Sequence, residues 1–326
     1  MINDKKFLKF EDGFFKPYFE KYIEFKRGKG EKVAHSTMIC LRKLNNSLNC
    51  YHVNHISEQM VEELLAPHEG LSESERQYKT SSLRQFCSFL TLLGIDAAVV
   101  PPKYMQAARS KFRPYIFSDD ELNRLVVAAD TLPPGRRSSA HQQIYPVLVR
   151  MLIGTGMRIG EALALTRADV DPSNGVINVI NGKNGVSRYI PVADSLKKVL
   201  HGYAEIIDMS DEEKPFFTSP YTGDHLTYDA MKYMFPKMFE AAGIYRADGK
   251  TPNIHSIRHT FCTKSLEKML GNGMDVYTAI PILAAYVGHV NYMDTEKYIH
   301  FTEQEHADFI KKEAYLGNLF PEVDNE

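Results

Sequence analysis

The residues that could act together on a phosphate lie in the C-terminal half of the chain. His255, Arg258 and His259 form a His-x-x-Arg-His motif. His289 follows in a Gly-His pair, and Tyr298 comes nine positions after His289. Guanidinium and imidazolium groups bind phosphate oxygens, and a phenol oxygen can act as a nucleophile. These residues are therefore candidates for chemistry on a phosphodiester.

Two further cations, Arg158 and Lys183, complete this candidate set. A phosphodiester under attack carries negative charge on its nonbridging oxygens, which the planar forks of Arg158 and Arg258 could clamp. A free tyrosine has a pKa of about 10, so Tyr298 would need a neighbouring cation or base. Lys183, in a Gly- and Asn-rich stretch, could protonate the departing 5′ oxygen. No carboxylate cluster suited to Mg²⁺ accompanies these groups, so the set predicts chemistry without metal or another cofactor.

Each of these residues also has a purely structural interpretation. A His-x-x-Arg-His motif is often only a pair on a helix surface, and a lone Tyr298 is often a half-buried aromatic. Arg158 and Glu161 are one helical turn apart and could simply pair. Lys183 on a turn would by default be exposed to solvent. Only the order and spacing of the complete set favour the chemical interpretation.

Residues 1–100 are expected to form about four or five helices and no strand. Apolar residues at three- and four-residue spacings predict a first helix within 7–25. Ser36 and Ser57 are expected to cap the next two helices, and Ser72 is expected to begin a longer one. The apolar face expected of that longer helix consists of Leu83, Phe86, Cys87, Leu90 and Leu93.

Basic residues in this region and after it are candidate DNA contacts. The candidates on the helices are Arg42, Lys43, Lys79 and Arg84. Two prolines end the helical region, and the expected linker at 101–115 carries Lys103, Arg109, Lys111 and Arg113. The alternative for the helical residues is a solvated surface, whereas the linker could lie along a DNA backbone. The net charge of −2 neither supports nor excludes DNA, because binding depends on where the basic groups lie.

Residues 116–316 are expected to be mostly helical, with one β-hairpin. Ser118 and the acids that follow it favour a helix start, and 144–153 is expected to be a buried helix. The stretch 176–192 alternates like a hairpin with a Gly- and Asn-rich tip. Further helices are expected near 194–207 and 227–242, from the His-x-x-Arg-His motif onward, and at 276–287 and 302–316. An acidic tail is expected at 317–326.

Composition limits the class of protein. The 326 residues are 44% hydrophobic and 25% charged, as in an ordinary soluble globular protein. No apolar run is long enough to cross a membrane, and no signal peptide follows the first residues, so a cytoplasmic location is expected. The four cysteines form no Cys-x-x-Cys pair, so no metal site is expected.

The complete set resembles the tyrosine recombinases, the family of phage-type integrases. The matching segments are the first box at 155–171, the hairpin with the catalytic lysine at 180–191, the second box at 255–259 and the final box at 287–300. In that final box the nucleophile follows the histidine by nine positions. The resemblance covers about 112–305, and 1–100 is more loosely similar to the core-binding domain. Four boxes in the right order make the resemblance specific.

The resemblance implies a fold and an activity. The implied fold is mainly α (α+β), with a SAM-like helical bundle as N-terminal core-binding domain and a mostly helical catalytic domain that holds a small antiparallel β-sheet. Tyr298 would attack the scissile phosphate to give a 3′-phosphotyrosine, without metal or ATP. The residues implied to hold the phosphate and handle protons are Arg158, Arg258, His255 and His289. Lys183 would be the general acid, with Glu161 and His259 in supporting roles.

The resemblance also implies partners and a role. The partners would be double-stranded DNA recombination sites and further copies of the chain, which would form a tetramer at a synapse with the 302–316 helix docked on a neighbour. Little room before Val33 is left for an arm-binding domain, so a simple two-domain recombinase of a mobile element is expected. The alternatives are Xer-type resolution of chromosome or plasmid multimers, a topoisomerase-like activity, and a DNA-binding protein without catalysis. The accessory proteins and the target sequence are not predicted.

Overall fold

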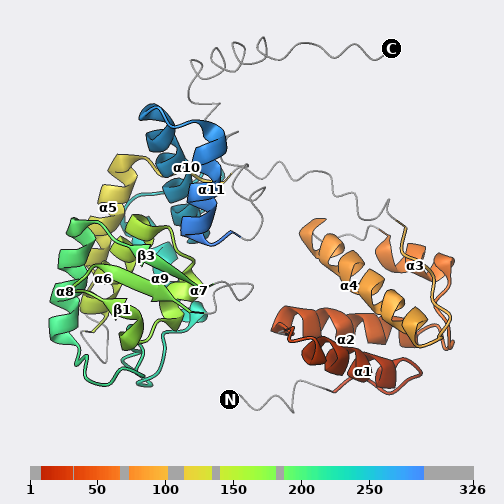
Figure 1. Ribbon diagram of the computed structural model, residues 1–326. Helices are drawn as coiled ribbons and strands as arrows, with labels where there is room; N and C mark the ends of the chain where they lie inside the picture. Colours follow the sequence, from red (N-terminus) through yellow and green to blue (C-terminus); the bar gives the residue numbers. More distant parts are fainter. Residues whose placement is uncertain are drawn as a thin grey trace, which may run out of the picture. The chain divides into compact units, whose positions relative to one another are not determined.

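A computed structural model describes residues 9–31, 33–66, 73–101, 114–133, 140–180 and 187–289. The chain divides into two compact units, Met1–Phe112 and Arg113–Glu326. The described parts of both units are mainly helical, and the three-stranded sheet belongs to the second (Figure 1). Within these ranges no helix is long and apolar enough to span a membrane.

The first unit packs its helices around an aromatic core. Its described helices are α1 (Lys16–Gly28), α2 (His35–Asn49), α3 (Glu58–Leu65) and α4 (Glu73–Leu92). The rings of Phe19 and Phe86 stack with centroids 3.7 Å apart, which joins α1 to α4. Leu41, Leu44 and Leu48 bury one face of α2, as the helical spacing predicts. The predicted cap of α3 is confirmed, because the Ser57 hydroxyl accepts from the Met60 N–H.

Two predictions for this unit are wrong in detail. The second helix begins at His35 after an extended Ala34, so Ser36 lies inside the first turn. The Ser36 hydroxyl instead lies 3.4 Å from the Tyr78 hydroxyl of α4, a partner that sequence spacing does not show. Leu93 is 46% exposed and does not join the apolar face of α4. The helix ends one residue earlier, and the chain turns away there.

The second unit surrounds a larger apolar core. Its helices are α5 (Asp119–Asp130), α6 (His141–Thr155), α7 (Ile159–Ala164), the 3₁₀ turn η3 (Arg167–Asp169), α8 (Asp194–Ile206), α9 (Tyr228–Ala241), α10 (His255–Gly271) and α11 (Val276–Val287). The predicted start of α5 is confirmed: the Ser118 hydroxyl accepts from the Glu121 N–H, and the Glu121 carboxylate accepts from the Ser118 N–H. The expected 302–316 helix and the 317–326 tail lie outside the described residues.

The predicted hairpin is present in a three-stranded antiparallel sheet. Its strands are β1 (Val170–Asp171), β2 (Val176–Val179) and β3 (Arg188–Pro191), in the order β1-β2-β3. Ile177 pairs with Ile190, and both are fully buried. Strand β1 was not predicted, because two residues carry no alternation to detect. The tip of the hairpin, with Lys183, lies outside the described residues.

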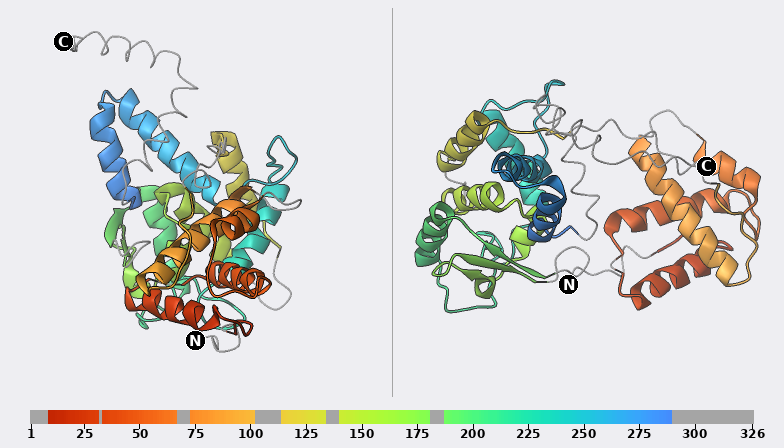
Figure 2. Two further views of the ribbon diagram at one scale, coloured as in Figure 1. Left: turned by 90° about the vertical axis from the view of Figure 1, so that its right-hand side faces the viewer. Right: turned by 45° about the horizontal axis from the view of Figure 1, so that its top comes forward.

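Three helix ends meet where α6, α10 and α11 approach one another. Helices α10 and α11 lie side by side (Figure 2), with Leu266 and Leu283 buried in a shared apolar cluster. Helix α6 is capped at its C-terminus by Gly156, whose left-handed backbone has φ of 59°. A Cβ at Gly156 would collide with the Phe261 ring of α10, so close packing also requires glycine. This arrangement brings the first box of the sequence against the second.

Candidate active site

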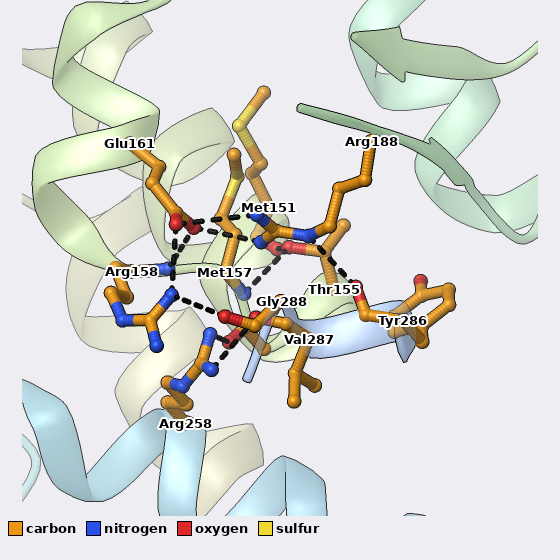
Figure 3. A network of polar contacts seen from close by, with 11 residues as sticks. Met151, Thr155, Met157, Arg158, Glu161, Arg188, Arg258, Tyr286, Val287 and Gly288 are labelled. Atoms are coloured by element: carbon orange, nitrogen blue, oxygen red, sulfur yellow. Dashed lines mark hydrogen bonds and ion pairs between the residues drawn. The ribbon is translucent and has the colours of Figure 1, made fainter. Parts of the chain in front are cut away.

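Arg158 lies at the corner between α6 and α7. Its backbone is extended, and its N–H donates to Glu161 Oε2 at 3.0 Å. The Arg158 guanidinium donates through Nη1 to Glu161 Oε1, also at 3.0 Å. The predicted structural pairing of these two residues is therefore present, and it holds the Arg158 side chain at the start of α7 (Figure 3).

Arg258 is buried inside the second unit. It lies on α10 and is only 2% exposed. Its Nη1 donates to the Gly156 carbonyl at 2.9 Å, and its Nη2 donates to the Val287 carbonyl at 2.8 Å. A guanidinium carries five N–H donors, so it can hold backbone carbonyls and bind a phosphate at the same time. Arg258 thus links the ends of two helices that are far apart in the sequence.

Three consecutive carbonyl groups at the end of α11 each accept a hydrogen bond from a different arginine (Figure 3). The bonds are Arg188 Nε to the Tyr286 oxygen at 2.9 Å, Arg258 Nη2 to the Val287 oxygen at 2.8 Å, and Arg158 Nη1 to the Gly288 oxygen at 3.2 Å. The last carbonyls of a helix lack partners within the helix and carry the negative end of its dipole. They are therefore favourable contacts for cations, and they gather three cations at one turn.

The predicted histidines lie beside this turn and in a neighbouring cavity. His289 directly follows the turn, and its N–H donates to the Ala284 carbonyl at 2.9 Å. His255 is the first residue of α10 and lines a cavity of about 370 Å³ together with Arg158 and Glu161. The rings of His255 and His259 meet edge to face, with centroids 4.7 Å apart. In the described part of the chain, no three His, Cys, Asp or Glu side chains are grouped so as to hold a metal ion.

The structure thus gathers part of the predicted set. Arg158, Arg258 and Glu161 lie around the turn that leads to His289, and His255 shares a cavity with Arg158. Lys183 and Tyr298 lie outside the described residues.

Sequence reasoning missed Arg188 as a residue of this site. Its side chain is 8% exposed and donates through Nη2 to Glu161 Oε2 at 2.8 Å. A usable signal was present, because alternate strand residues share a face and Arg188 is two positions from Ile190. Ile190 is fully buried, so a charge on the same face requires a buried partner of opposite charge.

The carboxyl of Glu161 is ionised in spite of its burial. Burial alone would raise the pKa of Glu161. Hydrogen bonds from Arg188 and from the Arg158 N–H, with the charge of Arg188, outweigh burial and hold this pKa below its ordinary value. The site is thus organised around a charged carboxylate.

This pKa predicts how the stability of the protein depends on pH. A carboxyl whose pKa is lower in the folded state stabilises the fold above its unfolded pKa, and that contribution is lost as pH falls through the folded pKa. Glu161→Gln is therefore expected to lower the free energy of unfolding at pH 7. The difference in the free energy of unfolding between this variant and the wild type should narrow as the pH falls below the ordinary carboxyl pKa of 4.5. Urea unfolding at a series of pH values measures this, with the exposed Glu240→Gln as control. A difference that is constant with pH would contradict the assignment.

The candidate DNA contacts of the first unit do not all lie together: Arg84 lines a pocket that contains neither Lys43 nor Lys79. Arg42 and Lys43 are on α2, which packs on α4. Burial lowers the pKa of Lys79, and the charge of Lys43 contributes, so these two lysines lie near each other. Arg84 instead lines a pocket with Lys26 of α1. The linker candidates Lys103, Arg109, Lys111 and Arg113 lie outside the described residues.

Comparison with known proteins gives consistent matches. The model of the Phage integrase family matches residues 116–305. A protein of Sinorhizobium fredii named as an integrase/recombinase, y4rE, is 29% identical over 233 residues, which cover 71% of this chain and 74% of that protein. The tyrosine recombinase XerC of Listeria welshimeri is also 29% identical over 233 residues, covering 69% of this chain and 71% of that protein.

Solved structures of the same fold cover most of the chain. The integrase of the Tn1549 transposon, in complex with transposon right end DNA, has a TM-score of 0.64 and 20% identity. The match covers 93% of this chain and 99% of that one. A lambda integrase dimer bound to a COC' core site also gives a TM-score of 0.64, at 17% identity, covering 86% of this chain and 94% of that one.

The fold that the resemblance implied is confirmed. The mainly helical architecture, with a small antiparallel sheet and a helical region before it, is that of these structures. The family match spans more than half of the sequence. The chain belongs to the phage integrase family and is a tyrosine recombinase, an enzyme that breaks and rejoins DNA.

Proposed function

We propose that the chain is a site-specific recombinase that cleaves double-stranded DNA through a 3′-phosphotyrosine on Tyr298. The observation that carries this proposal is the convergence of Arg158 and Arg258 on the turn before His289. Two guanidinium groups held by backbone carbonyls form a rigid cationic site next to an imidazole. A rigid cationic site is suited to the charge that builds on a phosphate during displacement.

In the proposed reaction each group has one task. The Tyr298 oxygen attacks the phosphorus, the bond from phosphorus to the 5′ oxygen breaks, and Lys183 gives that oxygen a proton. The guanidinium groups of Arg158 and Arg258 hold the nonbridging oxygens. One of the two histidines, His255 or His289, accepts the phenolic proton, and both bind the phosphate. Rejoining is the reverse attack by a 5′-hydroxyl, so the bond energy stays in the phosphotyrosine and no ATP is needed.

The biological role that we propose is integration and excision of a mobile element. The naming of y4rE of Sinorhizobium fredii as an integrase/recombinase supports this role. The XerC match favours a second candidate, resolution of chromosome or plasmid multimers. Deleting the gene distinguishes them. Loss of an excised circle of the flanking DNA would support the mobile element, whereas accumulation of dimeric chromosomes or plasmids would support resolution.

The proposed partners are recombination-site DNA and other copies of the chain. The lambda integrase structure is a dimer on a core site, and the XerH structure contains a palindromic difH substrate after cleavage. We infer that two protomers bind one site here, and that two such sites pair as a tetramer. Analytical ultracentrifugation of the protein with one site duplex would give the protomer number directly.

A selection experiment tests the proposed chemistry without knowledge of the target. The full chain is incubated in EDTA with a pool of nicked duplexes of randomised sequence, and adducts that survive SDS are recovered and sequenced. A tryptic peptide carrying nucleotides on Tyr298, attached through a 3′-phosphate, is the expected product. An adduct on another residue would overturn the nucleophile, and no adduct under any condition would overturn the activity. The recovered sequence then serves as the defined substrate, called here the selected duplex.

A further inference from the structure

The carboxylate of Glu161 is shared by two arginines in the interior of the second unit. The side chain of Glu161 is 6% exposed, and those of Arg188 and Arg158 are 8% and 20% exposed. Oε1 accepts from Nη1 of both arginines, at 3.0 Å from Arg158 and 3.3 Å from Arg188. Oε2 accepts from the Arg158 N–H at 3.0 Å and from Arg188 Nη2 at 2.8 Å. Each carboxylate oxygen thus contacts both arginines.

The charges of this group do not cancel. Arg158 and Arg188 each contribute +1 and Glu161 contributes −1, so the three together carry +1. Without Arg188, Arg158 and Glu161 would together have a net charge of zero. The Glu161 carboxylate would then neutralise the positive charge of Arg158. In a buried site this difference is large, because interactions there are little screened by solvent. Arg188 therefore decides whether the group presents a net positive charge to the cavity that Arg158 and Glu161 line.

Arg188 also fixes the position of the turn that precedes His289. Its Nε donates to the Tyr286 carbonyl at 2.9 Å, while its two Nη atoms hold Glu161. The guanidinium packs so closely on Gly288 that a Cβ there would lie 2.6 Å from Arg188 Nη1. One side chain of β3 therefore joins the first box to the final box (Figure 3).

We propose that Arg188 is a positioning residue for phosphate binding. Arg188 neutralises the charge of Glu161, so that the positive charge of Arg158 is available to bind the phosphate. This inference rests on the proposed function, because it assigns the phosphate to the Arg158 cavity. Arg188 itself acts through Glu161 and the α11 turn and does not touch the substrate. A lysine would keep the charge but could not form the three bonds of the guanidinium fork.

Two explanations of a defect in Arg188→Met are distinguished by a double variant. If Arg188 only stabilises the fold, adding Glu161→Gln removes a second anchor and makes the defect worse. If Arg188 balances charge, the double variant restores a net +1, now from Arg158 alone, and the defect shrinks. On the proposed explanation the two substitutions are therefore not additive, and the second one partly reverses the effect of the first. Contacting charged residues are expected to show such coupling.

The experiment compares the wild type with the single and double variants by two probes. The first is the rate of adduct formation on the selected duplex, measured below the lowest melting temperature among the variants. Arg188→Met is expected to slow it about 10²-fold, as expected for a misplaced catalytic group. The double variant should form the adduct about tenfold faster than Arg188→Met does. This corresponds to a coupling energy within the usual range for contacting residues. The second probe is inorganic phosphate, which should raise the melting temperature of the wild type and of the double variant more than that of Arg188→Met.

A neutral substrate and a matched variant complete the test. A methylphosphonate at the cleaved position removes one negative charge, so the rate defect of Arg188→Met relative to wild type should shrink. Arg150→Met removes a comparable bidentate ion pair, with Asp130, outside the site and should leave the adduct rate unchanged. Wild-type rates in Arg188→Met, or a double variant slower than both single variants, would overturn the inference. A wild type that responds to phosphate but forms no adduct would instead overturn the proposed function, while the phosphate arm still decides the role of Arg188.

Discussion

Replacing Tyr298 with phenylalanine is expected to abolish the covalent protein–DNA adduct and to leave binding of the selected duplex unchanged. The substitution removes only the phenolic oxygen, which is the proposed nucleophile, and keeps the ring. A neighbouring water could still reach the phosphate, but hydrolysis leaves no protein attached to the DNA. A nicked duplex resolved on a denaturing gel measures the adduct, and a mobility shift measures binding.

The control for this prediction is Tyr277→Phe. Tyr277 is 82% exposed on α11 and lies outside the candidate site, so its loss should leave both measurements unchanged. Adduct that persists in Tyr298→Phe would show that another residue attacks the phosphate. Loss of both adduct and binding would show that the phenol is needed for the complex itself, which also contradicts a purely nucleophilic role.

Local sequence patterns predict the parts of this fold that local forces determine. The helix start at Ser118 and the hairpin at 176–192 depend on neighbouring residues, and both are present. Ser36 shows the limit of that reasoning. Its type and position favour a cap, yet the helix already begins at His35 and the Ser36 hydroxyl lies beside Tyr78 on another helix. The local preference for a serine cap is only about 1 kcal/mol, which the packing of α2 on α4 is large enough to override.

The candidate site shows the same limit on a larger scale. Motif order indicates that Arg158 and Arg258 belong together, but it does not show what holds them in place. Both are fixed by carbonyls at the end of α11, and Arg188 holds the preceding carbonyl of that turn. The contacts of Arg158 and Arg188 span 130 and 98 residues of sequence, and that of Arg258 spans 29. All three involve backbone carbonyls, which carry no residue-specific signal. Only the folded arrangement shows that one helix end organises all three cations.

Arg258→Lys is expected to reduce adduct formation on the selected duplex by about 10²–10³-fold, the usual cost of losing one preorganised donor to a transition state. The lysine keeps a positive charge, but one ammonium cannot reproduce a planar fork that reaches two carbonyls and, in the proposed reaction, a phosphate. The free energy of unfolding should fall by about 1–3 kcal/mol, because a buried carbonyl of Gly156 or Val287 loses its donor. Adduct formation is measured well below the melting temperature, and stability is measured by urea unfolding.

Arg150→Lys is the control that separates the effect of losing a guanidinium fork on stability from its effect on adduct formation. Arg150 holds both oxygens of Asp130 through Nη1 and Nη2, at 2.6 and 2.7 Å, away from the candidate site. Its replacement should lower stability without changing the adduct rate of the folded protein. If Arg258→Lys lost stability but cleaved at the wild-type rate, Arg258 would serve only to join α6 to α11. The expected result is loss of both, because the bonds that hold the Arg258 guanidinium in the fold would also orient it toward the phosphate in the proposed reaction.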